Sequence, residues 1–236
     1  MIMIQFIKSR DPFLGIKTLA DRIVSALNND KKVLWLLSGG SNIDISVKVM
    51  SAVRDLMNES DKKKVLSNLT VSLVDERYGV LGHKDSNWKQ LEDAGFDFTS
   101  IKAIPILAGN SRNQASSLKE TAGVYQSSIK KAFDSSDLII AQIGIGSDGH
   151  IAGILPDSPA LESSGFVCAY ESRPYTRITL TPAALKAVDT AFVFAFGKNK
   201  KDAIENMGDP LVSLSRSPCV LLNEINEVTI YSDQEG

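Results

Sequence analysis

Residues 138–152 have the sequence LIIAQIGIGSDGHIA, an apolar run that leads directly into three glycines, an aspartate and a histidine. The run from Leu138 to Ile143, apolar except for Gln142, is typical of a buried strand. Glycine tolerates positive φ and lets a ligand approach the main chain, so a strand that ends in a glycine cluster often marks a binding turn. The stretch ends on His150, and histidine is a residue type suited to proton transfer. A plain strand-to-helix turn with a surface histidine is the alternative interpretation.

Strand and helix patterns alternate along the rest of the chain. A continuous apolar run at 33–37 and the largely apolar segments 70–74 and 190–196 predict strands, and apolar residues at helical spacing predict helices over 11–29 and 112–133. No internal repeat and no linker rich in Pro, Gly or Ser divides the chain. The sequence therefore predicts one α/β domain over residues 1–236, a Rossmann-like fold with a mostly parallel sheet flanked by helices on both faces.

Finer predictions concern helix ends and connections. Asp11 followed by Pro12 predicts the N-cap and the first residue of the first helix. The charged segment 61–68 is expected to be a solvated connection. Short strands are expected at 1–7, 101–107, 166–170, 177–181, 220–222 and 228–231, and short helices at 88–94, 182–186 and 197–207.

Composition limits the classes of partner. A chain of 236 residues with a formal net charge of −2 has no bulk attraction to nucleic acid or to an anionic membrane. No apolar run approaches the roughly 20 residues that span a bilayer, and the apolar segment at residues 1–6 is too short for a signal peptide. We therefore expect a cytoplasmic protein. Cys168 and Cys219 match no metal-binding spacing and are expected to be buried thiols, with a disulfide as the open alternative.

The segment Ser38-Gly39-Gly40-Ser41 separates a predicted strand from a predicted helix. This arrangement presents main-chain N–H groups and a helix N-terminus to an anion, typically a phosphate. The segment is neither a GxGxxG fingerprint nor a Walker A loop, because no Gly-Lys-Ser/Thr follows. Simple turn chemistry explains it equally well when it is taken alone.

Charged residues follow other predicted strands. Asp75, Glu76 and Arg77 come directly after the strand at 70–74, and Arg177 and Lys200 lie in two later strand or loop segments. Ligands of open α/β sheets collect outside the carboxyl ends of the strands. Arginine clamps phosphate bidentately and lysine adds a compact charge. Together with His150, these groups suit a phosphorylated small molecule that undergoes proton transfer or hydrolysis.

In this order the motifs resemble those of the 6-phosphogluconolactonase family, in the sugar-phosphate isomerase and deaminase superfamily. Residues 38–41 resemble its SGGS loop, 75–87 its DER…H-x-DSN segment, 144–156 its GxGxDGH…P core, 177–181 its RITLT strand and 197–200 its GxxK turn. The chain departs from two motifs. The family usually continues GGST-Pro, where this chain has Asn42, and DGHTASLFPG, where this chain has Ile151, Gly153 and Leu155.

The resemblance implies hydrolysis of 6-phosphogluconolactone, a reaction of the pentose phosphate pathway, without a metal or redox cofactor. It implies that His150 is the general base that activates water, while Asp148 orients it or shapes the turn. Arg77 would stabilise the carbonyl oxygen as it gains charge, and Asp75 belongs to the same catalytic group. The implied residues that bind substrate and phosphate are Gly39, Gly40, Ser41, Asn87, Gly146, Arg177 and Lys200. The only expected partner is a phosphorylated sugar lactone, and the protein is expected to be a monomer or a homodimer.

Two alternatives stay open. The departures beside His150 are compatible with a homologue that binds sugar phosphates without catalysis. Glucosamine-6-phosphate deaminase shares part of the motif, DGHIAFNEP, but it would need glutamate at Leu155 and tyrosine at Arg77. Leucine supplies no acid or base for opening an amino sugar ring.

Overall fold

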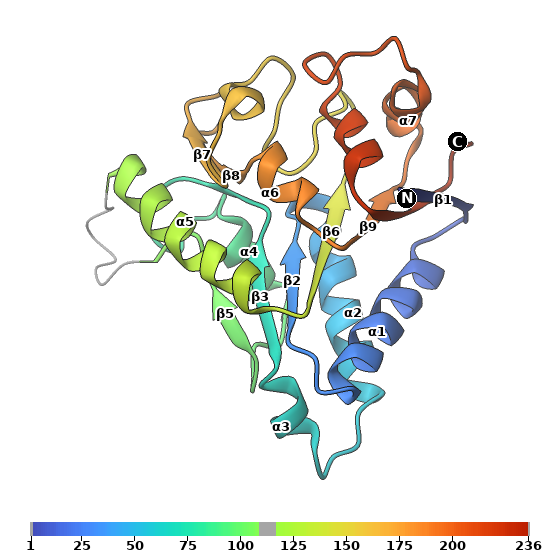
Figure 1. The fold of residues 1–236 in the computed structure, drawn as a ribbon, viewed down its shortest axis with the longest axis vertical. Helices are drawn as coiled ribbons and strands as arrows, with labels where there is room; N and C mark the ends of the chain where they lie inside the picture. Colours follow the sequence, from blue (N-terminus) through green and yellow to red (C-terminus); the bar gives the residue numbers. More distant parts are fainter. Residues whose placement is uncertain (1, 109–116, 236) are drawn as a thin grey trace.

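The computed structural model describes residues 2–108 and 117–235, and a parallel sheet runs through its centre (Figure 1). The seven strands of this sheet lie in the order β1-β10-β9-β6-β2-β3-β5, and every neighbouring pair is parallel. Their bounds are β1 Met3–Lys8, β2 Val33–Leu37, β3 Leu69–Leu73, β5 Lys102–Ile104, β6 Leu138–Gly144, β9 Thr190–Ala195 and β10 Glu227–Ser232. The predicted α/β fold with a mostly parallel sheet is confirmed.

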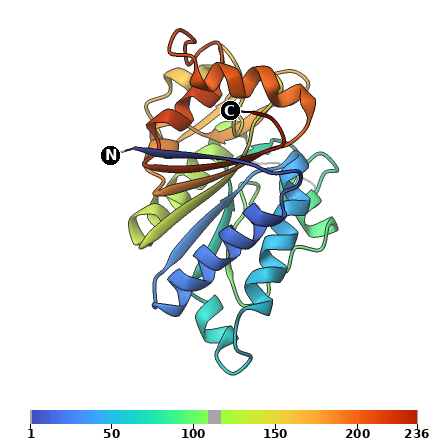
Figure 2. The same ribbon diagram turned by 90° about the vertical axis from the view of Figure 1, so that its right-hand side faces the viewer.

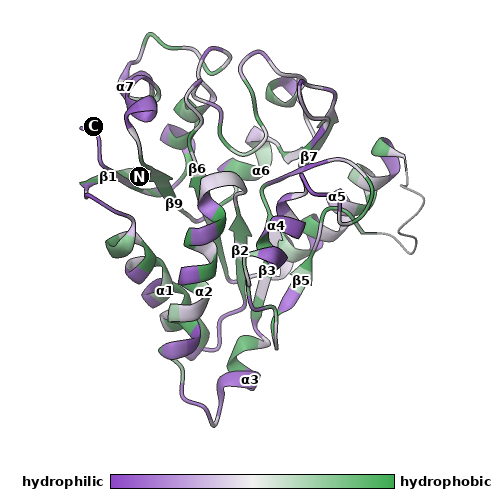
Figure 3. Ribbon diagram, turned by 180° about the vertical axis from the view of Figure 1, so that it is seen from behind, coloured by the Kyte–Doolittle hydropathy of each residue, from purple (hydrophilic) through white to green (hydrophobic). Residues whose placement is uncertain are grey.

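Helices cover both faces of this sheet. In Figure 1, α5 (Leu118–Ser135) and α6 (Pro182–Lys186) lie on the near face. Seen from behind in Figure 3, α1 (Phe13–Asn28), α2 (Ile43–Asp55) and α4 (Asn87–Asp93) lie on the other face. The described helices also include α3 (Lys62–Leu66) and α7 (Lys201–Gly208). No helix in the described ranges is long and apolar enough to cross a membrane.

The central strands are apolar on both sides because helices cover both of their faces. All five residues of β2 are buried, and Trp35 at its centre is 0% exposed. Helix α1 packs Leu19, Ile23 and Leu27 into the same core at helical spacing. In Figure 3 the apolar colour concentrates on the strands and on the inward sides of the helices.

A second, antiparallel sheet lies beyond the carboxyl ends of the parallel strands, in the upper part of Figure 1. It contains β4 (Asp75–Arg77), β8 (Arg177–Leu180) and β7 (Val167–Tyr170). Its register pairs Arg77 with Arg177 and Asp75 with Thr179. Charged residues that are about a hundred positions apart in the chain are therefore neighbours at the end of β3.

Several finer predictions need correction. Helix α1 begins at Phe13 with Pro12 as N-cap, one residue later than predicted, although Asp11 Oδ1 still accepts a hydrogen bond from Phe13 N at 2.9 Å. Segment 61–68 contains the short helix α3, whose Leu66 is buried. The strand predicted at 220–222 is wrong, because these residues belong to the 3₁₀ helix Pro218–Glu224. A run of three apolar residues has too few positions to separate the two periodicities.

The predicted helix over 112–133 is shorter at its start and longer at its end. Helix α5 begins at Leu118 after a capping box, in which Ser117 and Glu120 each bond to the other's main chain. Residues 112–116 of the prediction lie outside the described residues. Cys168 and Cys219 are both free thiols; Cys219 is buried and Cys168 is half-buried.

Candidate active site

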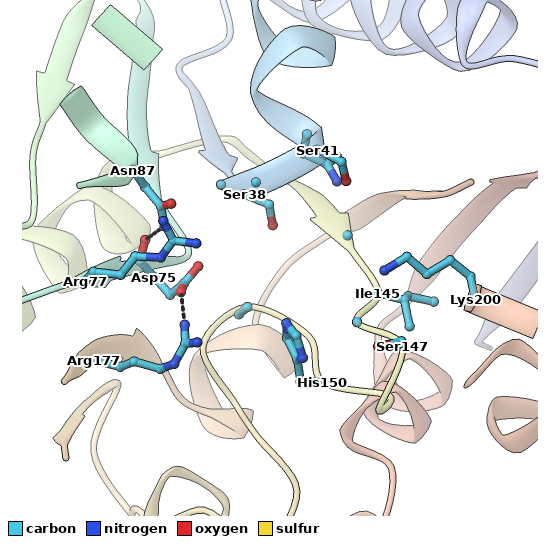
Figure 4. A pocket seen from close by; sticks show the side chains of 16 residues that line it. Ser38, Ser41, Asp75, Arg77, Asn87, Ile145, Ser147, His150, Arg177 and Lys200 are labelled. Carbon is cyan, nitrogen blue, oxygen red and sulfur yellow. Dashed lines mark hydrogen bonds and ion pairs between the residues drawn. The ribbon is translucent and has the colours of Figure 1, made fainter. Parts of the chain in front are cut away.

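A cavity of about 300 Å³ lies at the carboxyl ends of β2, β3, β6 and β9. Parallel strands end at one edge of a sheet, so the loops that follow them share this space. All predicted site residues except Asp148 line the cavity, namely Gly39, Gly40, Ser41, Asp75, Arg77, Asn87, Gly146, His150, Arg177 and Lys200. Figure 4 shows His150 between two groups, with Ser41 and Lys200 on one side and Arg77, Asp75 and Arg177 on the other.

The loop after β2 brings main chain close to the cavity. Gly40 has a φ of +61°, a conformation that side chains disfavour. Gly39 approaches the neighbouring α4 segment so closely that a Cβ atom there would lie 2.0 Å from Asn87 Oδ1. A single 3₁₀ turn, Gly40–Asn42, then leads into α2. The helix dipole of α2 favours an anion in this part of the cavity.

His150 and Asp148 form a hydrogen-bonded pair at the turn after β6. The distance between His150 Nδ1 and Asp148 Oδ1 is 2.5 Å, and His150 N also donates to Oδ1 at 3.2 Å. A carboxylate only accepts, so the proton of a neutral His150 lies on Nδ1 and the lone pair on Nε2. Gly146 is required beneath the ring, because a Cβ atom there would lie 2.1 Å from Nδ1. This arrangement can hold an imidazole as a general base.

The pKa of Asp148 is lowered from its ordinary value. Partial burial raises this pKa, but the charge of His150 and the hydrogen bonds from its main chain and ring outweigh the effect of burial. The carboxylate is thus the form that the folded protein favours.

This lowered pKa predicts a pH dependence of stability. A carboxylate with a depressed folded-state pKa stabilises the protein above its ordinary value of 3.8, and this contribution is lost as the pH falls through the folded-state pKa. We expect the free energy of unfolding to decrease below about pH 4, and Asp148→Asn to lack part of this decrease. Urea denaturation of both proteins over acidic pH measures it. If the free energy of unfolding falls equally with pH in wild type and in Asp148→Asn, Asp148 does not have a lowered pKa in the folded protein.

Two arginines and a buried aspartate form the opposite wall of the cavity. Arg177 Nη1 donates to Asp75 Oδ2 at 3.3 Å, and both side chains are at most 10% exposed. Burial raises the pKa of Asp75 more strongly than Arg177, Arg77 and His150 lower it. Arg77 donates to Asp85 O at 3.0 Å, and both guanidinium groups lie over the ring of Tyr175, at 5.1 and 5.9 Å. The guanidinium groups are therefore held in place without a bound ligand.

Lys200 supplies a cation of a different kind. It lies at the start of α7, and within residues 2–108 and 117–235 it forms no ion pair with a carboxylate. Burial lowers its pKa, and the nearby charge of Asp148 partly opposes this. Arg177 is already paired with Asp75, whereas among the described residues neither Lys200 nor Arg77 forms an ion pair with a carboxylate, so both are open to an anionic ligand.

Glu76 is a residue of the site that sequence reasoning left without a role. Its side chain is 0% exposed and accepts from Arg77 N, Ser86 Oγ, Asn87 N and Trp88 N at 2.6–3.0 Å. Burial raises the pKa of Glu76 above its ordinary value, and the hydrogen bonds from these donors offset this rise only in part. Glu76 thus fixes the main chain on either side of Arg77 and Asn87. Glu76 stands in the chain between Asp75 and Arg77, which were both predicted site residues, and this position was the sequence signal that could have identified it.

Ile151 and Gly153, two residues after His150 at which this chain differs from the family motif, lie beneath the cavity. Ile151 is 0% exposed. Gly153 N donates to Thr179 Oγ1 at 3.0 Å, and a Cβ atom at Gly153 would lie 2.9 Å from Asp75 Cβ and from Thr179 Cβ. The serine of the family motif would need a shift of Asp75 here. The glycine therefore matches the close packing of the Asp75 wall. Within the described residues no three His, Cys, Asp or Glu side chains are grouped as metal ligands.

Comparison with known proteins gives a consistent group of relatives. The family model described as glucosamine-6-phosphate isomerases/6-phosphogluconolactonase matches residues 15–231. A probable 6-phosphogluconolactonase 1 of Arabidopsis thaliana is 30% identical over 191 residues, which is 75% of this chain and 68% of that protein. The 6-phosphogluconolactonase of Borreliella burgdorferi is 30% identical over 158 residues, 64% of this chain and 66% of the relative.

Solved structures agree in fold. The 6-phosphogluconolactonase of Thermotoga maritima superposes with a TM-score of 0.76 and 18% identity, and the match covers 100% of both chains. A 6-phosphogluconolactonase from Shewanella baltica superposes with a TM-score of 0.74 and 20% identity, covering 100% of this chain and 98% of the other. At such identities the superpositions show a shared fold.

Proposed function

The chain belongs to the glucosamine-6-phosphate isomerase/6-phosphogluconolactonase family, and from this premise we propose that it hydrolyses 6-phosphogluconolactone to 6-phosphogluconate. The observation that carries the proposal is His150, hydrogen-bonded to Asp148, in one cavity with the Gly39–Ser41 loop and Lys200. A base and an anion site are the two parts that hydrolysis of a phosphorylated lactone needs.

In the proposed reaction, water attacks the lactone carbonyl carbon while His150 Nε2 takes one of its protons. Asp148 holds Nδ1–H and stabilises the imidazolium that forms, as in other carboxylate–histidine pairs. The carbonyl oxygen becomes an oxyanion, which Arg77 stabilises. The bond between the carbonyl carbon and the ring oxygen then breaks, and the ring oxygen receives the proton from His150. The products are a hydroxyl group and a carboxylic acid, which releases its remaining proton to solvent and becomes the carboxylate.

Asp75 serves this reaction through Arg177. Its buried carboxylate pairs with Arg177 Nη1 and supports the wall on which Arg77 lies. Asn87 and Gly146 contribute by geometry: Asn87 Nδ2 donates to Asp75 O at 3.0 Å, and Gly146 leaves room for the His150 ring. We assign the sugar ring to the space between this wall and His150.

We assign the phosphate group to Gly39, Gly40, Ser41 and Lys200, with Arg177 facing them across the cavity. The reason is that Lys200 lacks an ion pair in the described part of the chain, while the α2 N-terminus adds a positive end. A phosphate here would meet donors that no carboxylate occupies.

Removing this cation should weaken binding of phosphorylated ligands. We expect Lys200→Met to raise the Kd for 6-phosphogluconate by about 10- to 100-fold, the range for a lost hydrogen bond to a charged group. Calorimetry with 6-phosphogluconate and with unphosphorylated gluconate measures the effect and its dependence on phosphate. Lys198→Met is the matched control, because Lys198 is exposed on the same turn and does not line the cavity. Equal affinity in both variants would remove Lys200 from the phosphate site.

The activity itself is tested by adding the protein to freshly generated 6-phosphogluconolactone and subtracting spontaneous opening. The proposal expects acceleration that is proportional to protein concentration. Binding of 6-phosphogluconate without acceleration would instead identify a sugar-phosphate-binding protein. Deaminase chemistry is disfavoured by Leu155, which supplies no acid or base where that motif has glutamate.

A further inference from the structure

Asn42 is a nearly buried residue of the cavity wall with no assigned role. It is 1% exposed, lines the cavity and directly follows the Gly39–Ser41 loop. It also occupies the N-cap position of α2, where an asparagine side chain usually accepts from a main-chain N–H of the first turn. Its side chain makes no such hydrogen bond. Helix capping therefore does not explain why an asparagine is present.

Gln142 on β6 determines how the Asn42 amide is oriented. Gln142 is 0% exposed, and its Nε2 donates to Asn42 O at 3.1 Å and to Asn42 Oδ1 at 3.2 Å. A main-chain carbonyl only accepts, so the Gln142 amide must present its nitrogen to it. The same nitrogen then requires an acceptor on the Asn42 side chain. This network fixes Oδ1 toward Gln142 and Nδ2 away from it.

Among the described residues, the Asn42 Nδ2 group is a donor without an acceptor. It lies over Gly144, where a Cβ atom would come within 2.5 Å of it. In the described ranges it donates no hydrogen bond to the protein, although the residue is nearly buried. Both Gly144 and Asn42 line the cavity. An amide N–H group that is held in one orientation at a cavity wall suits an oxygen acceptor on the ligand.

We propose that Asn42 Nδ2 donates a hydrogen bond to the substrate's phosphate group, and that Gln142 is the positioning residue that aims it. This inference rests on the proposed function and adds a phosphate ligand at the position where the family motif has threonine. The phosphate is the acceptor because Asn42 adjoins Gly40 and Ser41 and borders the same cavity as Lys200. Nδ2 can only donate, which matches an oxyanion that only accepts.

The test compares three variants by calorimetry with 6-phosphogluconate and gluconate, together with kcat and KM for the fresh lactone. Asn42→Asp keeps the shape but replaces the donor by an acidic oxygen. A negative charge is favourable at the N-terminus of α2, so this variant should remain folded. Gln142→Leu leaves Asn42 in place but removes the hydrogen bonds that orient its side-chain amide. Asn42→Thr restores a hydroxyl donor. Asn58→Asp is the matched control, since Asn58 is exposed and distant from the cavity lining.

We expect Asn42→Asp to raise the Kd for 6-phosphogluconate at least about 10-fold and KM in parallel, with kcat changed less. Gln142→Leu should raise the Kd about 3- to 10-fold, by loss of orientation alone. Asn42→Thr should bind 6-phosphogluconate almost as tightly as wild type. The Kd for gluconate should stay the same in all three variants. A purely structural role would instead lower kcat and affect both ligands equally.

Separate outcomes overturn the two proposals. If wild type binds 6-phosphogluconate and Asn42→Asp binds it within twofold, the role of Asn42 is wrong whether or not the lactone is turned over. If wild type binds but does not accelerate lactone opening, the proposed function fails, and the binding measurements still decide the role of Asn42. If wild type neither binds 6-phosphogluconate nor accelerates lactone opening, both proposals fall.

Discussion

Replacing His150 by alanine is expected to lower kcat for lactone hydrolysis by about 10²- to 10⁴-fold, the usual contribution of a positioned general base. Affinity for 6-phosphogluconate should change little, because the phosphate donors belong to other loops. The physical reason is the Nδ1 contact with Asp148, which leaves Nε2 as the ring nitrogen that can take a proton from water. Initial rates on freshly prepared lactone, corrected for spontaneous opening, measure the effect.

The chain contains one other histidine, which provides a comparison for this experiment. His83 Nε2 contacts Arg77 O at 2.9 Å and does not line the cavity. His83→Ala should therefore lower kcat by less than about tenfold, and only because the contact of His83 with Arg77 is lost. A His150→Ala rate within twofold of wild type above background would make the proposed mechanism wrong.

Replacing Glu76 by glutamine is expected to lower the free energy of unfolding by about 3 kcal/mol, because buried donors lose their acceptor. The amide nitrogen of glutamine would face main-chain N–H groups of Asn87 or Trp88, which now donate to the Glu76 carboxylate. For a chain of this size the change corresponds to a decrease in Tm of roughly 6–12 °C. Urea denaturation and thermal unfolding measure it.

The control for this prediction is Glu59→Gln. The Glu59 side chain is 86% exposed and pairs only with Lys62 among the described residues, so its loss should stay within about 0.5 kcal/mol. Glu76→Gln should also raise KM, since the segment that Glu76 holds carries Arg77 and Asn87. If Glu76→Gln is as stable as wild type, the four hydrogen bonds to this carboxylate make no net contribution to the free energy of unfolding.

Much of the fold was predictable because its signals are local. The five apolar residues Val33–Leu37 correspond to β2 without error, and the run from Leu138 corresponds to β6. Parallel strands end at one edge, so motifs found separately in the sequence were expected to meet, and the cavity lining confirms that they do. The roles assigned to these residues, the single-domain boundaries and the oligomeric state remain predictions.

The remainder depended on contacts between distant residues. The pairing of β4 with β8 joins Asp75 to Arg177, which lie 102 positions apart, and no local pattern encodes that register. Asn42 and Gln142 are 100 positions apart, so their shared amide network was equally invisible. Glu76 carries a charge, and charged residues are almost never fully buried unless they are paired. Only the tertiary structure shows that its partners are three main-chain N–H groups and the Ser86 hydroxyl.

The strand order has a consequence for synthesis of the chain. At the edge of the sheet, β1 lies beside β10, as Figure 2 shows in dark blue and dark red. On the ribosome β1 emerges before β10, which is its only neighbour in the sheet among the described residues. Until then β1 is an unpaired apolar edge, exposed to other nascent chains and to chaperones. During this interval both sides of β1 lack a partner strand, whereas in the folded sheet β10 covers one of them.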